Sequence, residues 1–228
     1  MTLAHALRTG THSLHRSVEA SGLMSALLRG QIDRAGYVLM QRNLHAIYAA
    51  LEAALEQHSN HPALSPLGCA RYRRLDALAS DLLALQGPAW ALDLALMPTA
   101  AAYAEHLHGL AREQPARLAA HAYVRYLGDL SGGQMLRSIV AGALKLGDGV
   151  GTSFFDFGDS ATVQALAASF RAGLDALPLV AISTTALVQE AQFAFTLHAR
   201  LFDELDAARA SVPVQDFHAN AAVPDVAA

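Results

Sequence analysis

The stretch RYLGDLSGGQMLR at residues 125–137 decides the fold, because it places three glycines inside an otherwise helical pattern. Gly128, Gly132 and Gly133 should each cost about 1 kcal/mol relative to alanine in a helix interior. The segments HAYVRYL before them and MLRSIVAGAL after them continue the helical pattern, so we expect a helix kinked at the glycines rather than a loop. Backbone without side chains can lie close to a flat ligand.

The residues around these glycines are polar. Gly128 and Gly132 form a GxxxG pattern, but the neighbouring charges exclude a membrane helix dimer. Asp129 shares a helical face with Gly132 and Gly133, which would place a carboxylate beside the ligand-facing backbone. From spacing alone, an ordinary surface charge or a partner of a helix cap is an equally open interpretation of Asp129.

Composition predicts an all-α protein. The chain has 228 residues, of which 53% are hydrophobic and 16% charged, and runs of β-branched residues are scarce. Because no linker divides the chain, we expect one helical domain over residues 1–210 and a loose tail over residues 211–228. Helical periodicity predicts helices over residues 2–20, 33–57, 70–86, 99–112, 115–146, 160–177 and 184–209. Asp33 and Thr99 are the expected N-caps.

Several classes of protein are excluded. The net charge of −4 gives no electrostatic basis for nucleic-acid binding. The single cysteine, Cys69, rules out an internal disulfide and fits a reducing, cytoplasmic compartment. The N-terminus has histidines where a signal peptide needs an apolar core, and no apolar stretch is long enough for a membrane anchor.

The first predicted helix carries a polar face. Arg8, His12, His15 and Glu19 are spaced four, three and four residues apart, so they share one side of the helix. A glutamate four residues after a histidine can orient the ring and leave the other nitrogen free to bind a metal. Arg8 would lie about 10 Å from His15, at a distance suited to the carboxylate edge of a large flat ligand. A surface or satisfied core histidine is the alternative, and no further ligands support a zinc pair from His12 and His15.

The chain resembles the heme oxygenase family. The segment YVRYLGDLSGGQML (123–136) resembles the distal-helix signature of that family, and LRTGTHSLHRSVEASGLMSALLRGQI (7–32) resembles its proximal-helix segment. HAIYAALE (45–52) and EAQFAFTLHARLFDEL (190–205) are similar to further blocks in the same order. The resemblance implies a single all-α domain, a helical bundle with heme sandwiched between a proximal and a distal helix.

The resemblance also implies roles for individual residues. On the proximal side, His15 would bind the heme iron and Glu19 would orient His15. On the distal side, Gly128, Gly132 and Gly133 would pack over the heme, while Asp129 would anchor a water network with Arg125 and Tyr48 nearby. Three further residues, Arg8, Tyr123 and Arg171, would hold the heme propionates. Phe195 matches an aromatic residue near the distal pocket.

The implied reaction is the oxidative opening of heme, which is both cofactor and substrate, to biliverdin, iron and CO. It requires O₂ and external electrons from a ferredoxin or an NAD(P)H-dependent reductase such as a flavoprotein, and a biliverdin-using protein could accept the product. Matching propionate contacts imply cleavage at the α-meso carbon. A neutral histidine ligand suits this path, whereas a thiolate would favour early O–O cleavage.

Two positions depart from the family pattern. His12 stands where some relatives carry a lysine near the propionates, and His198 stands where relatives commonly carry an asparagine near the distal water network. For the electron donor, a basic docking surface could be formed by Arg16, Arg112, Arg117 and Arg137, although ordinary solvated charge is the favoured interpretation of each. The competing functions are a heme carrier or sensor without turnover, and a helical scaffold that binds no heme.

Overall fold

The computed structural model describes residues 1–178 and 182–211, and no strand occurs within these ranges. The helical elements, in chain order, are α1 Leu3–Glu19, α2 Gly22–Leu28, α3 Arg34–Gln57, η1 Ser65–Leu67, η2 Cys69–Tyr72, α4 Leu75–Gln86, α5 Trp90–Asp93, α6 Pro98–Glu113, η3 Pro115–Arg117, α7 Leu118–Ala122, η4 Tyr123–Leu127, α8 Gly128–Leu144, η5 Ser153–Phe155, α9 Ser160–Asp175 and α10 Thr184–Ser211. The expected single all-α domain is confirmed. Of the expected tail, Ser211 ends α10 and the rest lies outside the described residues.

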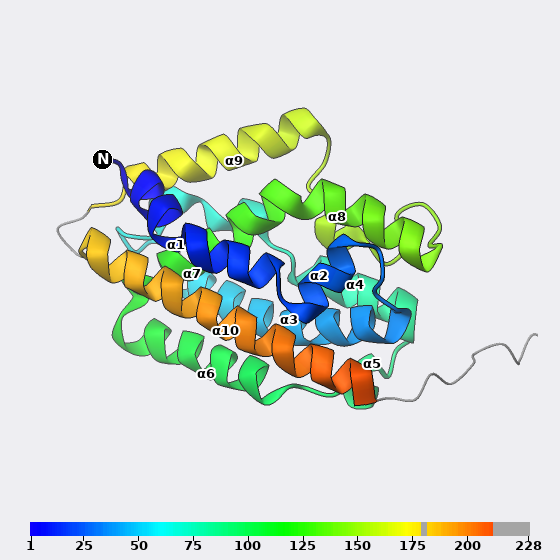
Figure 1. Ribbon diagram of the computed structural model, residues 1–228. Coiled ribbons are helices and arrows are strands. Elements are labelled where there is room, and N and C mark those ends of the chain that lie inside the picture. Colours follow the sequence, from blue (N-terminus) through cyan, green and yellow to red (C-terminus); the bar gives the residue numbers. More distant parts are fainter. Residues whose placement is uncertain (179–181, 212–228) are drawn as a thin grey trace, which may run out of the picture.

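The two long helices α3 and α10 organise the bundle (Figure 1). Helix α10 lies along α1, and α6 flanks it on the other side, while α3 packs against α6 and α4. Close approach of α1 to α10 requires Gly10, because a Cβ there would lie 2.5 Å from Val188 Cγ1. The core is continuous, and its largest fully buried side chains include Tyr37, Tyr48 and Tyr126.

Helix ends follow the sequence in part. Asp33 caps α3 as expected, since its side chain accepts the Gly36 N–H at 2.6 Å. The expectation for Thr99 is wrong: Met97 is the N-cap of α6, and Thr99 lies inside the first turn. There, Glu204 of α10 accepts both the backbone N–H and the hydroxyl of Thr99, at 3.1 and 2.5 Å. A carboxylate from a distant helix therefore replaces the local cap.

The expected helix over residues 115–146 is present as a continuous helical run from Pro115 to Leu144, but its helical type changes along the run. It divides into η3, α7, η4 and α8, and η4 is a π-helical turn that ends directly before Gly128. Gly128, Gly132 and Gly133 continue as regular α-helix and have no positive φ. The irregularity thus precedes the glycines instead of falling on them, and π-turns of this kind are frequent at functional sites.

A buried carboxylate holds the loop that carries η5. Asp81 of α4 accepts the backbone N–H groups of Ser153 and Phe154, each at 2.8 Å. Phe154 then packs edge-on against Tyr48, with the ring centroids 5.5 Å apart. This contact fixes η5 against α3, and η5 also packs against α8. Within the described residues, no helix is long and apolar enough to cross a membrane.

Candidate functional site

A cleft separates α1 from α8 and encloses a cavity of about 270 Å³. Its walls come from α1, α2, α3, η4, α8, α10 and the loop at η5, and they are mostly apolar. The lining side chains are Val18, Met24, Leu27, Leu28, Met40, Leu44, Val124, Met135, Leu136, Phe154, Phe155, Phe195 and Phe202, with the polar or small residues His15, Glu19, Arg125, Gly128, Asp129, Ser131, Gly132 and His198. Two segments more than a hundred residues apart in the sequence therefore face one space.

His15 lies on the α1 side of this cavity with its ring accessible. Half of its side-chain surface is exposed, and Nδ1 lies 3.5 Å from the Glu19 carboxylate, one helical turn away. The Phe195 ring of α10 meets the imidazole edge-on, with centroids 5.7 Å apart. The carboxylate beside Nδ1 leaves Nε2 as the free nitrogen, which is the arrangement of a metal-binding histidine.

On the opposite side, α8 presents backbone. A Cβ at Gly128 would meet no described atom within 4 Å, and a Cβ at Gly132 would meet only Leu136 Cδ1, at 3.9 Å. Gly133 has another environment, since a Cβ there would lie 3.2 Å from the Phe155 carbonyl oxygen. The first two glycines leave room in the cavity, whereas Gly133 permits close packing of α8 against η5.

Asp129 belongs to a closed hydrogen-bond network at the floor of the cavity. Its Oδ1 accepts from the Arg125 guanidinium at 2.8 Å, and its Oδ2 accepts a short hydrogen bond from the Tyr48 hydroxyl. The Tyr48 oxygen in turn accepts from Arg125 Nε at 3.1 Å. Arg125 and Asp129 are one helical turn apart and both are nearly buried. Asp129 is thus a held, buried carboxylate, and the alternative of an ordinary surface charge is wrong.

Burial dominates the electrostatics of this network. Desolvation raises the pKa of Asp129, and the charge of Arg125 and the Tyr48 hydroxyl oppose that rise. For Arg125, burial acts to lower the pKa, but Asp129, Tyr48 and Tyr103 together more than offset it, so the pKa is raised. The pKa of Tyr48 is raised well above 10, mainly by burial. The cavity floor therefore carries one compensated ion pair.

His198 of α10 extends the network and is fixed in one tautomer. Its Nδ1 lies 2.9 Å from the Ala194 carbonyl oxygen, which can only accept, so Nδ1 carries the hydrogen. Its Nε2 therefore accepts from Arg125 Nη1, at 2.8 Å. Burial and the nearby Arg125 charge lower the pKa of His198 to about 3. The residue is a neutral support for Arg125, with both ring nitrogens in use.

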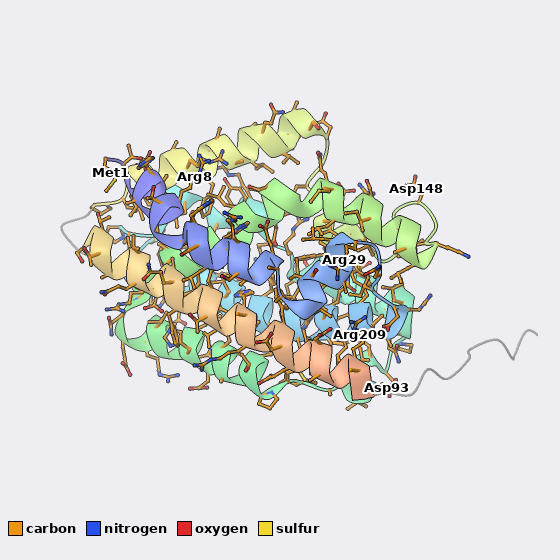
Figure 2. All side chains as sticks on the ribbon, viewed as in Figure 1. Met1, Arg8, Arg29, Asp93, Asp148 and Arg209 are labelled. Atoms are coloured by element: carbon orange, nitrogen blue, oxygen red, sulfur yellow. The ribbon has the colours of Figure 1, made fainter. Side chains whose placement is uncertain are left out.

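The three residues expected at the propionates gather at one place. Tyr123 starts η4, and its hydroxyl lies 3.4 Å from Thr11 Oγ1 of α1. Burial raises the pKa of Tyr123, while the positive charges of Arg8 and Arg171 act to lower it, so both guanidinium groups lie near this phenol. Figure 2 labels Arg8 in the first half of α1, where α1 contacts α9, the helix of Arg171. This cluster can bind a doubly anionic edge.

The structure also places Phe195 and His12. Phe195, which the resemblance implied near the distal pocket, lines the cavity and also contacts His15. His12 is exposed on α1. The sequence analysis did not predict the apolar walls from α2 and η5. Both elements are too short to give a clear periodic signal. The aromatic pair Phe154–Phe155, which lies between glycines, was the available sign of η5.

The arginines considered for a docking surface lie on four different elements, and three of them form ion pairs. Arg112 pairs with Glu105 at 3.4 Å, Arg117 with Glu190 at 2.8 Å and Arg137 with Asp156 at 3.0 Å. They lie on α6, η3 and α8, and Arg16 is exposed on α1. Arg112, Arg117 and Arg137 each have a nearby acidic partner, which favours the interpretation of these three arginines as ordinary surface charges.

The geometry suits a flat, largely apolar ligand with a metal at its centre and anions at one edge.

A family model for heme oxygenases matches residues 1–204. The chain is 37% identical to a heme oxygenase of Pyropia yezoensis over 205 residues, covering 90% of this chain and 86% of that protein. Two solved structures are similar. Heme oxygenase-2 of Synechocystis, in complex with heme and NO, gives a TM-score of 0.88 at 35% identity and covers 93% and 88% of the two chains. A heme oxygenase of Leptospira interrogans gives 0.85 at 31%, covering 90% and 100%.

Proposed function

This chain belongs to the heme oxygenase family, an enzyme family of heme degradation, and from that premise we propose that it converts heme to biliverdin, iron and CO. The proposal includes cleavage at the α-meso carbon. The observation that carries it is the cavity that His15 lines together with the side-chain-poor surface of Gly128 and Gly132. A planar macrocycle fits between an imidazole and exposed backbone, whereas bulky side chains on α8 would fill that space.

The heme, when bound, supplies the iron that binds O₂ and accepts electrons. His15 would hold it through Nε2, and Glu19 beside Nδ1 would orient the ring. Ligation by a neutral imidazole is compatible with ring opening, whereas a thiolate ligand would favour early O–O cleavage.

Asp129 is proposed to govern protons at the floor of the cavity. Arg125 and Tyr48 hold both of its oxygens, so the carboxylate can order water above them without swinging into the cavity. His198 also lines the cavity, but both of its ring nitrogens are engaged and it stays neutral, so it supports Arg125 rather than donating a proton.

Arg8, Tyr123 and Arg171 are proposed to bind the propionates. Charge-assisted hydrogen bonds orient a ligand strongly, so this cluster would set the rotation of the ring and hence the meso carbon that faces the cavity floor. The electrons are proposed to come from a ferredoxin or an NAD(P)H-dependent flavoprotein reductase, and a biliverdin-using protein would accept the product. A reducing, cytoplasmic setting fits the single cysteine.

The test is addition of hemin to the purified chain, followed by reductant and O₂, with the bilin isomer identified by chromatography. We expect a Soret band on addition of hemin and then its conversion to α-biliverdin. The variant His15→Ala should fold normally, because the side chain is half exposed, but should lose iron ligation and turnover. A stable Soret band without bilin formation would support a heme carrier instead, and no Soret band would exclude both functions.

A further inference from the structure

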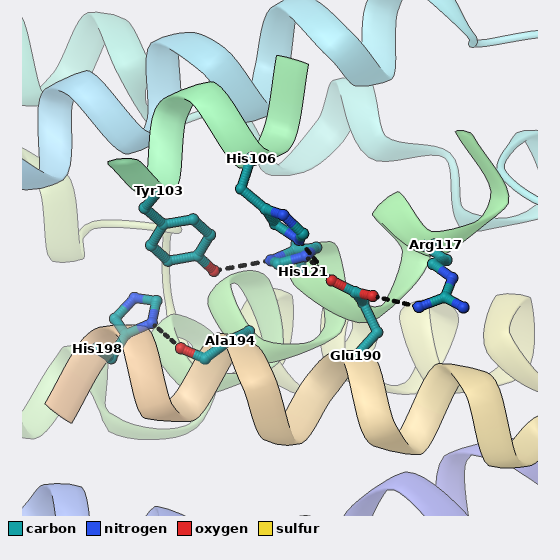
Figure 3. A network of polar contacts seen from close by, with 7 residues as sticks. All are labelled: Tyr103, His106, Arg117, His121, Glu190, Ala194 and His198. Carbon is teal, nitrogen blue, oxygen red and sulfur yellow. Dashed lines mark hydrogen bonds and ion pairs between the residues drawn. The ribbon is translucent and has the colours of Figure 1, made fainter. Parts of the chain in front are cut away.

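A second cluster of potential metal ligands lies outside the cleft, where α6, α7 and α10 meet (Figure 3). His106 Nε2 lies 2.7 Å from Glu190 Oε1, and His121 Nε2 lies 3.0 Å from the same oxygen. Within the described residues, these three ligand atoms are all within 4.8 Å of one another. His121 and Glu190 are buried, while His106 keeps about a third of its side chain exposed and forms the outer wall.

The spacing of these atoms matches metal coordination. Two ligands that bind one ion at about 2.1 Å and at right angles to each other lie about 3.0 Å apart. The two measured N–O separations already have this size, so an ion could enter between the three side chains with small rotations of the rings. Two imidazoles and one carboxylate form the donor set typical of Fe²⁺, Zn²⁺ and related ions.

We propose that His106, His121 and Glu190 form a binding site for a divalent first-row transition-metal ion, distinct from the heme cleft. The carboxylate is suited to this role because both imidazoles converge on its Oε1, while Arg117 binds its Oε2. The exposed side of His106 provides the entry path for the ion and room for water on the remaining positions.

A hydrogen bond from outside the cluster orients one of the proposed ligands, His121. Glu190 Oε1 can only accept, so in the metal-free state His121 Nε2 carries the hydrogen and Nδ1 accepts from the Tyr103 hydroxyl, at 2.9 Å. On metal binding the ring would change tautomer, with Nδ1 donating to the Tyr103 oxygen. That contact corresponds to the outer-shell hydrogen bond of metal-binding histidines.

The positive charge of Arg117 opposes binding of a cation at this cluster, so its removal provides the sharpest test. Its guanidinium binds Glu190 Oε2 at 2.8 Å, so a positive charge lies one carboxylate away from the proposed ion. Removing this charge should strengthen metal binding, although it removes a hydrogen bond from the cluster. A merely structural network predicts no such gain.

The experiment measures Zn²⁺ binding to the full, heme-free chain by calorimetry, and the absorption spectrum of Co²⁺ as a probe of its ligands. One Zn²⁺ per chain should bind. His106→Gln should weaken this affinity by more than about a hundredfold, since even an outer-shell partner is worth tenfold to a hundredfold. His108→Gln, exposed two residues away on the same helix, is the matched control and should change nothing. Arg117→Gln should tighten binding roughly tenfold.

Circular dichroism of each metal-free variant checks that the chain is folded. Of the ligand substitutions, His106→Gln should disturb the fold least, because the His106 side chain reaches the surface. If Glu190→Gln also folds, it should lose the Co²⁺ spectrum. Zn²⁺ binding that is absent, that survives in His106→Gln, or that falls equally in His108→Gln overturns the proposal. None of these outcomes depends on hemin or on bilin formation, so they leave the proposed function untouched.

Discussion

The variant His198→Asn should lose less stability than the wild-type chain when the pH falls from 7 to 5. His198 is almost fully buried, donates to the Ala194 carbonyl and accepts from Arg125. Both burial and the Arg125 charge oppose its protonation, which lowers its pKa from 6.5 to about 3. In the unfolded chain the same imidazole gains a proton near its ordinary pKa. Asparagine does not titrate and keeps a donor at this position.

The sign and size follow from linkage. Between pH 6.5 and pH 3 the unfolded chain binds the proton and the folded chain does not, so acid favours unfolding. The stability that depends on a neutral His198 is complete above about pH 6.5 and is lost as the pH falls toward 3. From pH 7 to pH 5, these two pKa values predict a loss of about 2 kcal/mol from this residue.

The assay is urea unfolding of the heme-free chain, followed by circular dichroism at several pH values between 5 and 7. The wild-type free energy of unfolding should fall about 2 kcal/mol further than that of His198→Asn over this range. Any constant difference in stability between the two proteins does not matter, since only the pH dependence is compared. His108→Asn, at an exposed site, should follow the wild type. Parallel curves for wild type and His198→Asn would refute the neutral, buried histidine.

Two further changes test the cavity floor and the glycine surface. Asp129→Asn should lower the free energy of unfolding by about 3 kcal/mol, because it leaves the buried Arg125 charge uncompensated. Hemin should still give a Soret band while the yield of bilin falls, and unchanged stability in urea would contradict the ion pair. Gly128→Ala should raise the stability of the heme-free chain by up to about 1 kcal/mol and weaken hemin binding. Gly133→Ala should gain less or lose stability, because its Cβ would press on the Phe155 carbonyl, and equal melting temperatures of the two variants would exclude this difference.

Much of the fold could be read along the chain because it depends on local signals. The predicted helix over residues 33–57 matches α3 within one residue, since Asp33 caps it with its own side chain. The same reasoning failed at Thr99, where the hydrogen bonds come from Glu204, a residue 105 positions away. It also missed α2, whose N-cap Ser21 makes no side-chain capping bond that a motif would reveal.

The site divides in the same way. The pairing of His15 with Glu19 and of Arg125 with Asp129 follows from four-residue spacing on one helix, so the sequence by itself determined these contacts. The sequence also determined the helical class, through its periodicity, and the two segments that face the cleft, through their glycines and histidine. Only the tertiary structure decided that Tyr48 and His198 close the network around Arg125, and that His106, His121 and Glu190 converge. Those contacts join separate helices, and their distances depend on how the helices pack, which no local spacing encodes.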